Sequence, residues 1–488
     1  MEIKLKNIGI VKDSTISVKG LTVITGKNNS GKTTVGKALY SLLDAVSNID
    51  AKARIDRAQF VLKKLDDVRG CLDILRFFRS LYDIDEENKN QNPLAKYPAL
   101  QLVTTREIGF DIARDDAENV ARALETELHK LNIDELSESE IIKHYVRRFR
   151  TKHEGDSAAG EILAEQRDKA LSILSDLFAI LSKDPHLIDY TRESINQTLR
   201  NEFANQIEPV SVDTADSKIE IFNDGTQCFC VGIKNNRVIS DGTPVFINSP
   251  YKKTYLIDNP FIWDETTIIR RSLRNSVDID AESLLNPNNI LSHCNKLRYV
   301  IRHKRQPSVL EQTILNESLA KVKARIDDVL PGTFEFSSDG DYYVHKGAKL
   351  KVANLATGSK MFSIVKLLLE KGEVGSSTML ILDEPEAHLH PEWQNKFAEI
   401  IVLLVKDLKV NILLTTHSSN FVLALDAYMR KYEIEDVTNF YQTEPLECGM
   451  VEYKCVNDNI NTIYQDFLEY MSQVKMLRNN CIRNVGDN

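Results

Sequence analysis

The chain has 488 residues, of which 42% are hydrophobic and 27% charged, and its formal net charge is −9. This length and composition exclude a single small domain and are typical of a globular protein with two or three units. The acidic balance argues against a uniformly basic nucleic-acid binder. No apolar run is as long as a membrane span, the first residues lack a signal-peptide core, and the seven cysteines are scattered. We therefore expect a cytoplasmic protein with reduced thiols and no membrane partner.

Residues 1–45 are predicted to form the first part of a nucleotide-binding core. Two β-type runs, EIKLKNIGIV and LTVITG, precede the stretch GKNNSGKTT, and a helical run, VGKALYSLLDAV, follows it. Two glycines at this spacing between a strand and a helix are typical of a loop whose backbone N–H groups face phosphate oxygens. The predicted phosphate-binding residues are Gly26, Lys27, Asn28, Asn29, Ser30, Gly31, Lys32, Thr33 and Thr34.

Two side chains of this loop have separate predicted roles. Lys32 would contact the β- and γ-phosphates of a nucleotide, and the hydroxyl of Thr33 would bind Mg²⁺. Kinases, GTPases, helicases and transport motors share such a loop, so the rest of the chain must decide between them.

The middle of the chain has a different composition. Residues 46–205 carry long, charged helical patterns and are predicted to form a helical insertion. Residues 206–350 contain alternating, hairpin-like runs over 208–248, a second helical stretch over 279–329 and short strands in TFEFSSDGDYYVHKG. We expect this part to complete the head of the protein, and the segment FINSPYKKTYLIDNP within it to lie near the nucleotide.

Residues 351–488 return to alternating strands and helices. The buried strand TMLILDEP ends in Asp383 and Glu384, a position from which one carboxylate can support Mg²⁺ and the next can activate water. A second buried strand, ILLTTHS, ends in His417, which can contact the γ-phosphate. Upstream, NLATGSK opens an apolar helix, and a helix N-terminus can bind an anion. The runs NFYQTE and GMVEYKCV are predicted to complete the sheet.

The ordered set GKNNSGKTT, LATGSK, ILDEPEAHLHP and LLTTHS resembles the ABC ATPases of the SMC, RecF and OLD group. The resemblance covers roughly the first 40 and the last 140 residues. It implies an α/β fold with an ABC-type P-loop NTPase core, in which helices flank a mixed sheet and a large helical insertion splits the core. It also implies ATP and Mg²⁺ as cofactors.

The resemblance assigns roles to particular residues. Asp383 with Thr33 would hold the metal, Glu384 would be the catalytic glutamate, and His417 the switch histidine. Residues 386–390 would form the D-loop, in which His388 and His390 would be packing residues and not metal ligands. The signature would present Thr357, Gly358 and Ser359 to ATP bound by a second subunit, which predicts a homodimer or higher homo-oligomer through an ATP sandwich. Ala356 stands where the family usually has serine.

Only 71 residues follow His417, and they contain no Asp-x-Asp pair of the nuclease domain that OLD proteins carry. The chain thus resembles the stand-alone ATPase subunits of antiphage systems such as Septu, PARIS and some retrons, which implies a separately encoded effector nuclease or toxin. A DNA repair or recombination ATPase of the RecF type is the alternative, and the large insertion disfavours a transport motor. Basic clusters at 144–153, 268–274 and 297–305 are candidate nucleic-acid contacts, and Tyr299 makes the third the preferred one.

Overall fold

The computed structural model describes residues 1–76, 93–104, 116–139, 142–143, 158–183, 187–209, 216–239, 249–263, 293–302, 309–337, 340–465, 468 and 472–477. Contacts divide the chain into two compact units. The first contains Met1–Ile49 and the described parts of Ile188–Ser276 and Asn289–Asn488. The second contains the described parts of Asp50–Leu187. The basic clusters at 144–153 and 268–274 lie outside the described residues.

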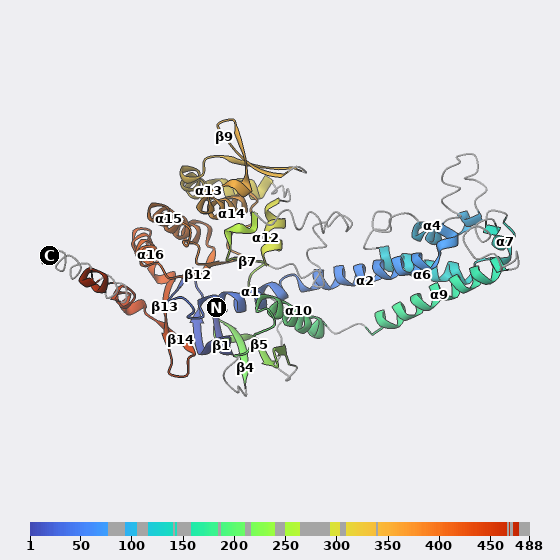
Figure 1. The fold of residues 1–488 in the computed structure, drawn as a ribbon, viewed down its shortest axis with the longest axis horizontal. Coiled ribbons are helices and arrows are strands. Elements are labelled where there is room, and N and C mark those ends of the chain that lie inside the picture. Colours follow the sequence, from blue (N-terminus) through green and yellow to red (C-terminus); the bar gives the residue numbers. More distant parts are fainter. Residues whose placement is uncertain are drawn as a thin grey trace, which may run out of the picture. The chain divides into compact units, whose positions relative to one another are not determined.

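The first unit is built around a mixed sheet with eleven strands within the described residues, in the order β6-β5-β4-β1-β2-β14-β13-β3-β12-β11-β7 (Figure 1). Neighbouring strands from β13 to β7 run parallel, whereas the strands from β6 to β2 pair in antiparallel fashion. The strands are β1 (Glu2–Ile8), β2 (Val11–Ser17), β3 (Leu21–Thr25), β4 (Ser217–Asn223), β5 (Thr226–Lys234), β6 (Arg237–Val238), β7 (Lys253–Ile257), β11 (Thr378–Asp383), β12 (Asn411–Thr416), β13 (Thr438–Pro445) and β14 (Val451–Cys455).

Helices cover both faces of the parallel strands, which is why β3, β7, β11 and β12 are buried at almost every position. Figure 1 shows α13 to α16 gathered on one side of β12 and α1 with α10 on the other. The helices of this unit are α1 (Lys32–Val46), α10 (Leu187–Glu202), α12 (His293–Arg302), α13 (Val309–Val329), α14 (Thr357–Glu370), α15 (Pro391–Leu408) and α16 (Ser419–Lys431). The α/β fold with a mixed sheet and flanking helices is thus confirmed.

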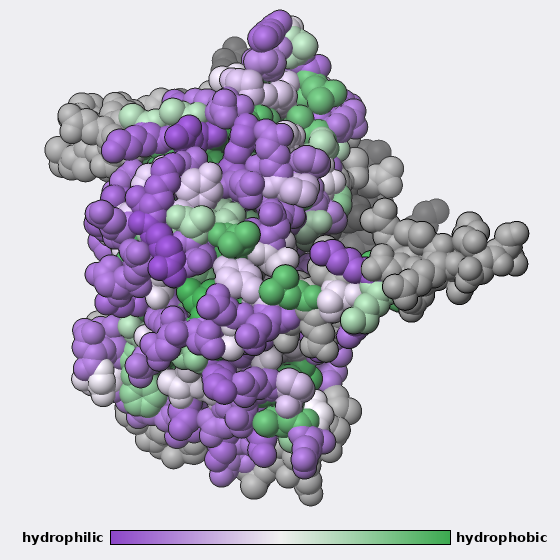
Figure 2. All heavy atoms as spheres, turned by 90° about the vertical axis from the view of Figure 1, so that its left-hand side faces the viewer, coloured by the Kyte–Doolittle hydropathy of each residue, from purple (hydrophilic) through white to green (hydrophobic). Residues whose placement is uncertain are grey.

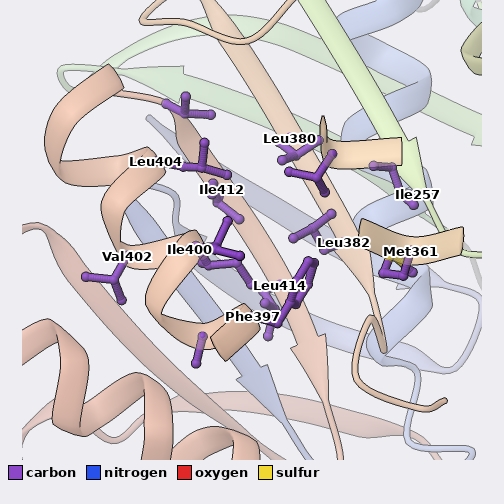
Figure 3. Packing of buried hydrophobic residues seen from close by; sticks show 14 of the residues in the cluster. Ile257, Met361, Leu380, Leu382, Phe397, Ile400, Val402, Leu404, Ile412 and Leu414 are labelled. Carbon is purple, nitrogen blue, oxygen red and sulfur yellow. The ribbon is translucent and has the colours of Figure 1, made fainter. Parts of the chain in front are cut away.

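Side chains of one strand enter the two cores alternately, as the pleat of a strand requires. In β11, Leu380 and Leu382 pack with Phe397 of α15, as Figure 3 shows, while Met379 and Ile381 face the core that contains α1. Gly36 lies where α1 crosses β11, and a Cβ atom there would stand 3.0 Å from Cγ2 of Ile381. The glycine therefore brings α1, and with it the phosphate-binding loop, close to the strand that carries the acidic pair.

Parallel register brings the carboxyl ends of the central strands to one edge. Thr25 at the end of β3 pairs with Thr416 of β12, and Thr415 pairs with Asp383 of β11. Ile257 at the end of β7 pairs with Leu382. Ligands of parallel α/β sheets bind at this edge, so the register alone assembles the candidate site.

The N-terminal run differs from its prediction. EIKLKNIGIV was expected to be one strand, but β1 ends at Ile8, the chain turns at Gly9 with a φ of 55°, and β2 runs back beside it. Ile8 pairs with Val11, which leaves a two-residue turn. Ile8 and Ile10 continue the alternation of apolar residues through the turn, so the pattern did not reveal it. The hairpin expected within 208–248 is present as β4 and β5.

Helix α10 belongs to the first unit, although the sequence analysis placed its residues in the insertion. Ile195 and Leu199 are buried in the core that contains α1, and the hydroxyl of Ser194 donates to the Ala45 carbonyl oxygen at 3.1 Å. An amphipathic pattern predicts a helix but does not say which core its apolar face will cover.

A small antiparallel sheet forms part of the same unit. It contains the short strands that were predicted in TFEFSSDGDYYVHKG. It consists of β8 (Thr333–Ser337), β9 (Gly340–His345) and β10 (Ala348–Lys351). Trp263 joins it to α14, because its ring stacks on Phe334 and Phe336 and its Nε1 donates to Oγ of Ser363 at 3.0 Å.

The second unit is helical where it is described. Its core holds buried side chains of every main helix, including Leu65, Leu100, Leu124 and Leu174. Hydrogen bonds from Arg57 and Arg122 lower the pKa of Glu118 on its surface. The main helices are α2 (Ile49–Cys71), α4 (Pro98–Val103), α6 (Ala117–His129), α7 (Ile133–Ser137) and α9 (Ala158–Leu181).

Within the described residues, the helices are too short or too polar for any of them to cross a membrane. Figure 2 shows one face of the molecule, on which hydrophilic side chains dominate and hydrophobic ones are scattered in small patches. Leu423 of α16 is one of the few large apolar side chains more than half exposed. Small apolar patches are normal on a protein surface and indicate no partner by themselves.

Candidate nucleotide-binding site

The loop between β3 and α1 has the backbone that its glycines predict. Gly26 has a φ of 157° and Gly31 a φ of 73°, and Asn29 also lies in the left-handed region with a φ of 61°. A Cβ atom on Gly26 would meet Oγ1 of Thr443 at 1.9 Å, so only glycine fits there. The loop thus curls back over the end of β3 and leads directly into α1.

The loop presents hydrogen-bond donors that the chain does not use. Gly31 precedes α1, and no described side chain caps the helix N-terminus. The hydroxyl oxygen of Ser30 is buried and has no hydrogen-bond partner among the described residues. Free N–H groups at a helix N-terminus and an unpaired hydroxyl fit an anionic ligand. The residues present therefore fit a nucleotide phosphate.

Lys32 is held inside the loop. Its side chain is 4% exposed, and Nζ donates to the carbonyl oxygens of Gly26 at 3.1 Å and Lys27 at 2.8 Å. The same ammonium group lies 3.3 Å from Oε1 of Glu384. A buried ammonium needs negative or polar partners on all sides, and a phosphate would compete with Glu384 for this one.

Thr33 and Asp383 meet as the metal prediction requires. The Thr33 hydroxyl donates to Oδ2 of Asp383 at 2.8 Å, and the Thr415 hydroxyl donates to Oδ1. Burial raises the pKa of Asp383, the two hydrogen bonds lower it in part, and the charges of Glu384 and Asp258 raise it further. A buried carboxylate crowded by other acids gains from a cation beside it. This arrangement fits Mg²⁺ held through Thr33 with support from Asp383.

Glu384 and His417 stand together at the sheet edge. Glu384 has a φ of 47°, which its backbone holds by donating from N to the carbonyl and hydroxyl oxygens of Thr415. Nδ1 of His417 lies 3.2 Å from Oε1 of Glu384, but without hydrogen-bond alignment, and that nitrogen has no hydrogen-bond partner in the part of the chain that the structure describes. An acid held in a strained backbone conformation beside an unpaired imidazole is typical of a functional position.

The predicted signature opens α14. Ala356 precedes the helix with a φ of −56° and a ψ of 144°, the conformation of a capping residue, but its methyl group caps nothing. Thr357 is partly exposed, and Ser359 is buried. A Cβ atom on Gly358 would lie 3.0 Å from Cδ2 of Leu389 and 3.3 Å from the His388 carbonyl oxygen. The signature and the D-loop of one chain are therefore packed together.

The D-loop is fixed at several points. Glu386 is 1% exposed, accepts from the Thr416 hydroxyl, and has one carboxylate oxygen without a described partner. Burial raises the pKa of this carboxyl group. The ring of His388 packs edge-on against Phe261, and Nδ1 of His390 accepts from the Glu392 N–H at the start of α15. The two histidines have packing and capping contacts, and with Glu386 they form no metal-ligand group among the described residues.

Several residues near the site were missed. Thr415 holds both acids, and its place in the buried run ILLTT is a signal that could have found it. The Tyr453 hydroxyl donates to the Gly31 carbonyl oxygen at 2.6 Å across 422 residues of sequence, a contact for which the sequence has no signal. Asp258 follows β7 beside Asp383 and lies in the segment FINSPYKKTYLIDNP, which was expected near the nucleotide, but no role was predicted for this residue.

The preferred nucleic-acid cluster, 297–305, is partly structural. Arg298 is 5% exposed and donates through Nε to the Ile262 carbonyl oxygen at 2.8 Å. Nε of Arg302 lies 3.2 Å from Oδ1 of Asp341. These two guanidinium groups hold α12 in place, and the residues from 303 to 305 lie outside the described part.

The uncapped start of α14 gives a testable prediction. Ala356→Ser is expected to raise the free energy of unfolding by about 1 kcal/mol, because a serine hydroxyl at this position can accept from the N–H groups of the first turn. Urea unfolding measures the change. Ala353→Ser, at an exposed alanine outside the helix N-terminus, is the matched control and should change stability little. Equal midpoints for the two variants would show that no cap forms.

Comparison with known proteins places these features in a family. The chain matches the family described as AAA ATPase domain over residues 1–422. Comparison with curated proteins found no match.

Solved structures that match the chain include SMC head domains. The SMC head domain from Thermotoga maritima is 10% identical with a TM-score of 0.33, covering 93% of this chain and 98% of that one. The Smc head domain with a coiled coil and joint from Pyrococcus yayanosii is also 10% identical with a TM-score of 0.33, covering 96% and 99%. A head bound to the C-winged helix domain of ScpA is 10% identical with a TM-score of 0.32, covering 93% and 96%.

The ordered motifs and the mixed sheet agree with the family match, which spans residues 1–422 of 488. The chain belongs to the AAA ATPase domain family.

Proposed function

We propose that this chain binds ATP with Mg²⁺ and hydrolyses it to ADP and phosphate at the edge of the parallel sheet. One observation carries the proposal: Lys32 of the loop lies 3.3 Å from Glu384, and Thr33 of the same loop donates to Asp383 at 2.8 Å. A phosphate ligand, a metal-binding hydroxyl, a metal-supporting acid and a candidate base thus converge from two motifs that are 350 residues apart.

Each residue has a chemical role in this proposal. Lys32 and the N–H groups of the loop neutralise and orient the triphosphate, and bound Mg²⁺ supplies further positive charge at the phosphates. Thr33 and Asp383 provide the metal's protein contacts. The γ-phosphate would replace Glu384 as the partner of the Lys32 ammonium, and Glu384 would then be available to accept the proton of the attacking water. His417, beside Glu384, donates to the γ-phosphate and senses whether it is present.

Lys32→Ala tests the loop assignment. We expect the variant to lose ATP binding, because the buried ammonium of Lys32, held inside the loop, would neutralise the phosphates. Isothermal titration with Mg²⁺ and ATP measures it. Lys12→Ala, which removes an exposed lysine from β2, is the matched control and should bind like the unmodified chain. Tight binding by the Lys32 variant would overturn the assignment.

We further propose that two copies of the chain sandwich ATP. The loop of one subunit would hold the phosphates, and Thr357, Gly358 and Ser359 of the other would contact the γ-phosphate from the opposite side. Support comes from the start of α14, which has no capping side chain among the described residues and so has N–H groups to offer an anion.

For the cellular role, we propose a sensor subunit of an antiphage complex that controls a separately encoded nuclease or toxin. The support is the resemblance of the ordered motifs to stand-alone ATPase subunits of such systems, and a RecF-like repair ATPase is the second candidate. Bacteria that carry the gene with its neighbours would be challenged with phages and with DNA damage. Protection from phages that Lys32→Ala abolishes supports the first role, whereas altered damage survival alone would replace it with the second.

A further inference from the structure

Four side chains from three separate segments of the first unit converge beside the end of β7. Asp258 follows β7 directly, His293 and Cys294 open α12, and Glu202 is the last residue of α10. The His293 side chain is 10% exposed and that of Glu202 is 3% exposed. None of the four residues belongs to the loop, the acidic pair or the signature, so the proposed ATP site does not explain them.

The imidazole of His293 is at the centre of this cluster. Its Nδ1 lies 2.7 Å from Oε2 of Glu202, and its Nε2 lies 2.9 Å from Oδ1 of Asp258 and 3.2 Å from Sγ of Cys294. Sγ of Cys294 is 3.9 Å from the same oxygen of Asp258. Tyr40 of α1 packs edge-on against the ring. One nitrogen is thus held by a buried acid while the other faces a carboxylate and a thiol.

These spacings can be compared with those of a metal site. Zinc bonds of about 2.0 to 2.3 Å in tetrahedral geometry place neighbouring ligand atoms about 3.3 to 3.6 Å apart. Here the nitrogen of His293 lies 2.9 Å from the oxygen of Asp258 and 3.2 Å from the sulfur of Cys294, and the oxygen lies 3.9 Å from the sulfur. Shifts of a few tenths of an ångström in the side chains would match them to one ion. Glu202 completes the pattern, because histidine ligands usually donate from their other nitrogen to a carboxylate.

We propose that Asp258, His293 and Cys294 bind Zn²⁺ and that Glu202 positions the histidine. A thiolate with an imidazole favours zinc over Mg²⁺ and Ca²⁺, which prefer oxygen ligands. Three protein ligands leave the fourth tetrahedral position to water. The site borders the proposed ATP site, because Asp258 follows the strand that pairs with β11, but it contains no residue of the loop, the acidic pair or the signature.

A metal-free cluster would have a different chemistry. Burial alone would lower the pKa of His293, but its contacts with Asp258, Cys294 and Glu202 raise that pKa to about 12. Without metal, hydrogen bonds hold the ring between the two acids, and the sulfur of Cys294 makes only a hydrogen-bond contact with the ring. With zinc, the Nε2 proton and the thiol proton leave, and sulfur bonds to the metal. A bond between the metal and the sulfur of Cys294 therefore distinguishes the zinc-bound cluster from the metal-free one.

Cobalt reports such a bond directly. The full chain, freed of metal and without nucleotide, would be titrated with Co²⁺, and we expect one equivalent to produce the near-ultraviolet charge-transfer absorption of a cobalt–thiolate bond. Added Zn²⁺ should displace Co²⁺ and remove the band. Cys294→Ser is expected to lack the band, whereas Cys455→Ser, at an exposed cysteine of β14, should retain it. Glu202→Gln is expected to weaken metal binding by about 10- to 100-fold.

Two results would overturn the proposal. One is the absence of a thiolate band when the unmodified chain is titrated, which leaves His293 held by hydrogen bonds between the two acids without a metal. The other is a band that persists in folded Cys294→Ser. If circular dichroism shows that this variant does not fold, the Co²⁺ and Zn²⁺ titrations of the unmodified chain and of Glu202→Gln still decide. Because no ATP is present, the outcome is independent of the proposed ATPase activity.

Discussion

Replacing Glu384 with glutamine is expected to preserve ATP binding and to slow hydrolysis by about 100-fold or more, the usual contribution of a positioned general base. Oε1 of Glu384 lies 3.3 Å from Nζ of Lys32 and 3.2 Å from Nδ1 of His417. Glutamine has the same size but cannot accept the proton of water. It also no longer competes with phosphate for the Lys32 ammonium, so we expect ATP to bind at least as tightly as before.

Calorimetric titration with Mg²⁺ and ATP, together with phosphate release, separates binding from hydrolysis in this variant. Because hydrolysis would normally dissolve the ATP sandwich, Glu384→Gln should accumulate as an ATP-dependent dimer or larger assembly in size-exclusion chromatography. Glu447→Gln makes the same chemical change at an exposed site and is the matched control. Phosphate release at the unmodified rate would rule out Glu384 as the base.

Most of the candidate site could be predicted because its parts are local patterns on parallel strands. A glycine-rich loop after a buried strand fixes the phosphate position, and two other buried strands end at Asp383 and at Thr416, directly before His417. Parallel strands have their carboxyl ends at one edge, so three separate motifs had to meet there. Close packing of α1 on β11 at Gly36 then brings Thr33 to Asp383.

The features that were missed depend on contacts between distant segments. Tyr453 supports the loop from β14, and Glu202 reaches His293 from a helix whose sequence shows only an amphipathic pattern. Neither residue belongs to a motif, and single polar residues at helix or strand ends are common. The turn at Gly9 was missed for another reason, because apolar residues on both sides of it continued one alternation. The periodicity of apolar residues predicts individual helices and strands, but it does not show which of them will pack together.

If the signature of one subunit completes the ATP site of another, two inactive variants should restore activity when they are mixed. Lys32→Ala removes the phosphate ligand of a subunit's own loop. Ala356→Asp places a carboxylate at the start of α14, where the γ-phosphate of the partner's ATP would dock. Gly358 is less suitable for this test, because a side chain there would meet Leu389 of its own D-loop at 3.0 Å.

Ala356→Asp has the advantage that it should not harm folding. Aspartate is a preferred capping residue, and it should stabilise α14 by about 1 kcal/mol. Loss of activity would then come from charge repulsion and not from unfolding. Ala356→Ser, which adds a cap without charge, is the matched control and should remain active.

Each variant alone is expected to be inactive. On mixing, random pairing makes half of the dimers mixed, and one of the two sites in each mixed dimer is intact, so about a quarter of the unmodified activity should return. Recovery requires that subunits exchange and that a single intact site can turn over. Once exchange of subunits has been verified, failure to recover would therefore show either that both sites must fire together or that no site is shared.

Dilution of the unmodified chain distinguishes these two explanations. A shared site exists only in the dimer, so ATP turnover per subunit should fall as the concentration drops below the dissociation constant of the pair. Mass photometry at each dilution gives the dimer fraction, and turnover should follow it. A site complete within one chain would keep its turnover where only monomers remain. Constant turnover among monomers would thus refute the role of Thr357 to Ser359 in trans, and would leave the loop, Asp383 and Glu384 as a self-sufficient site.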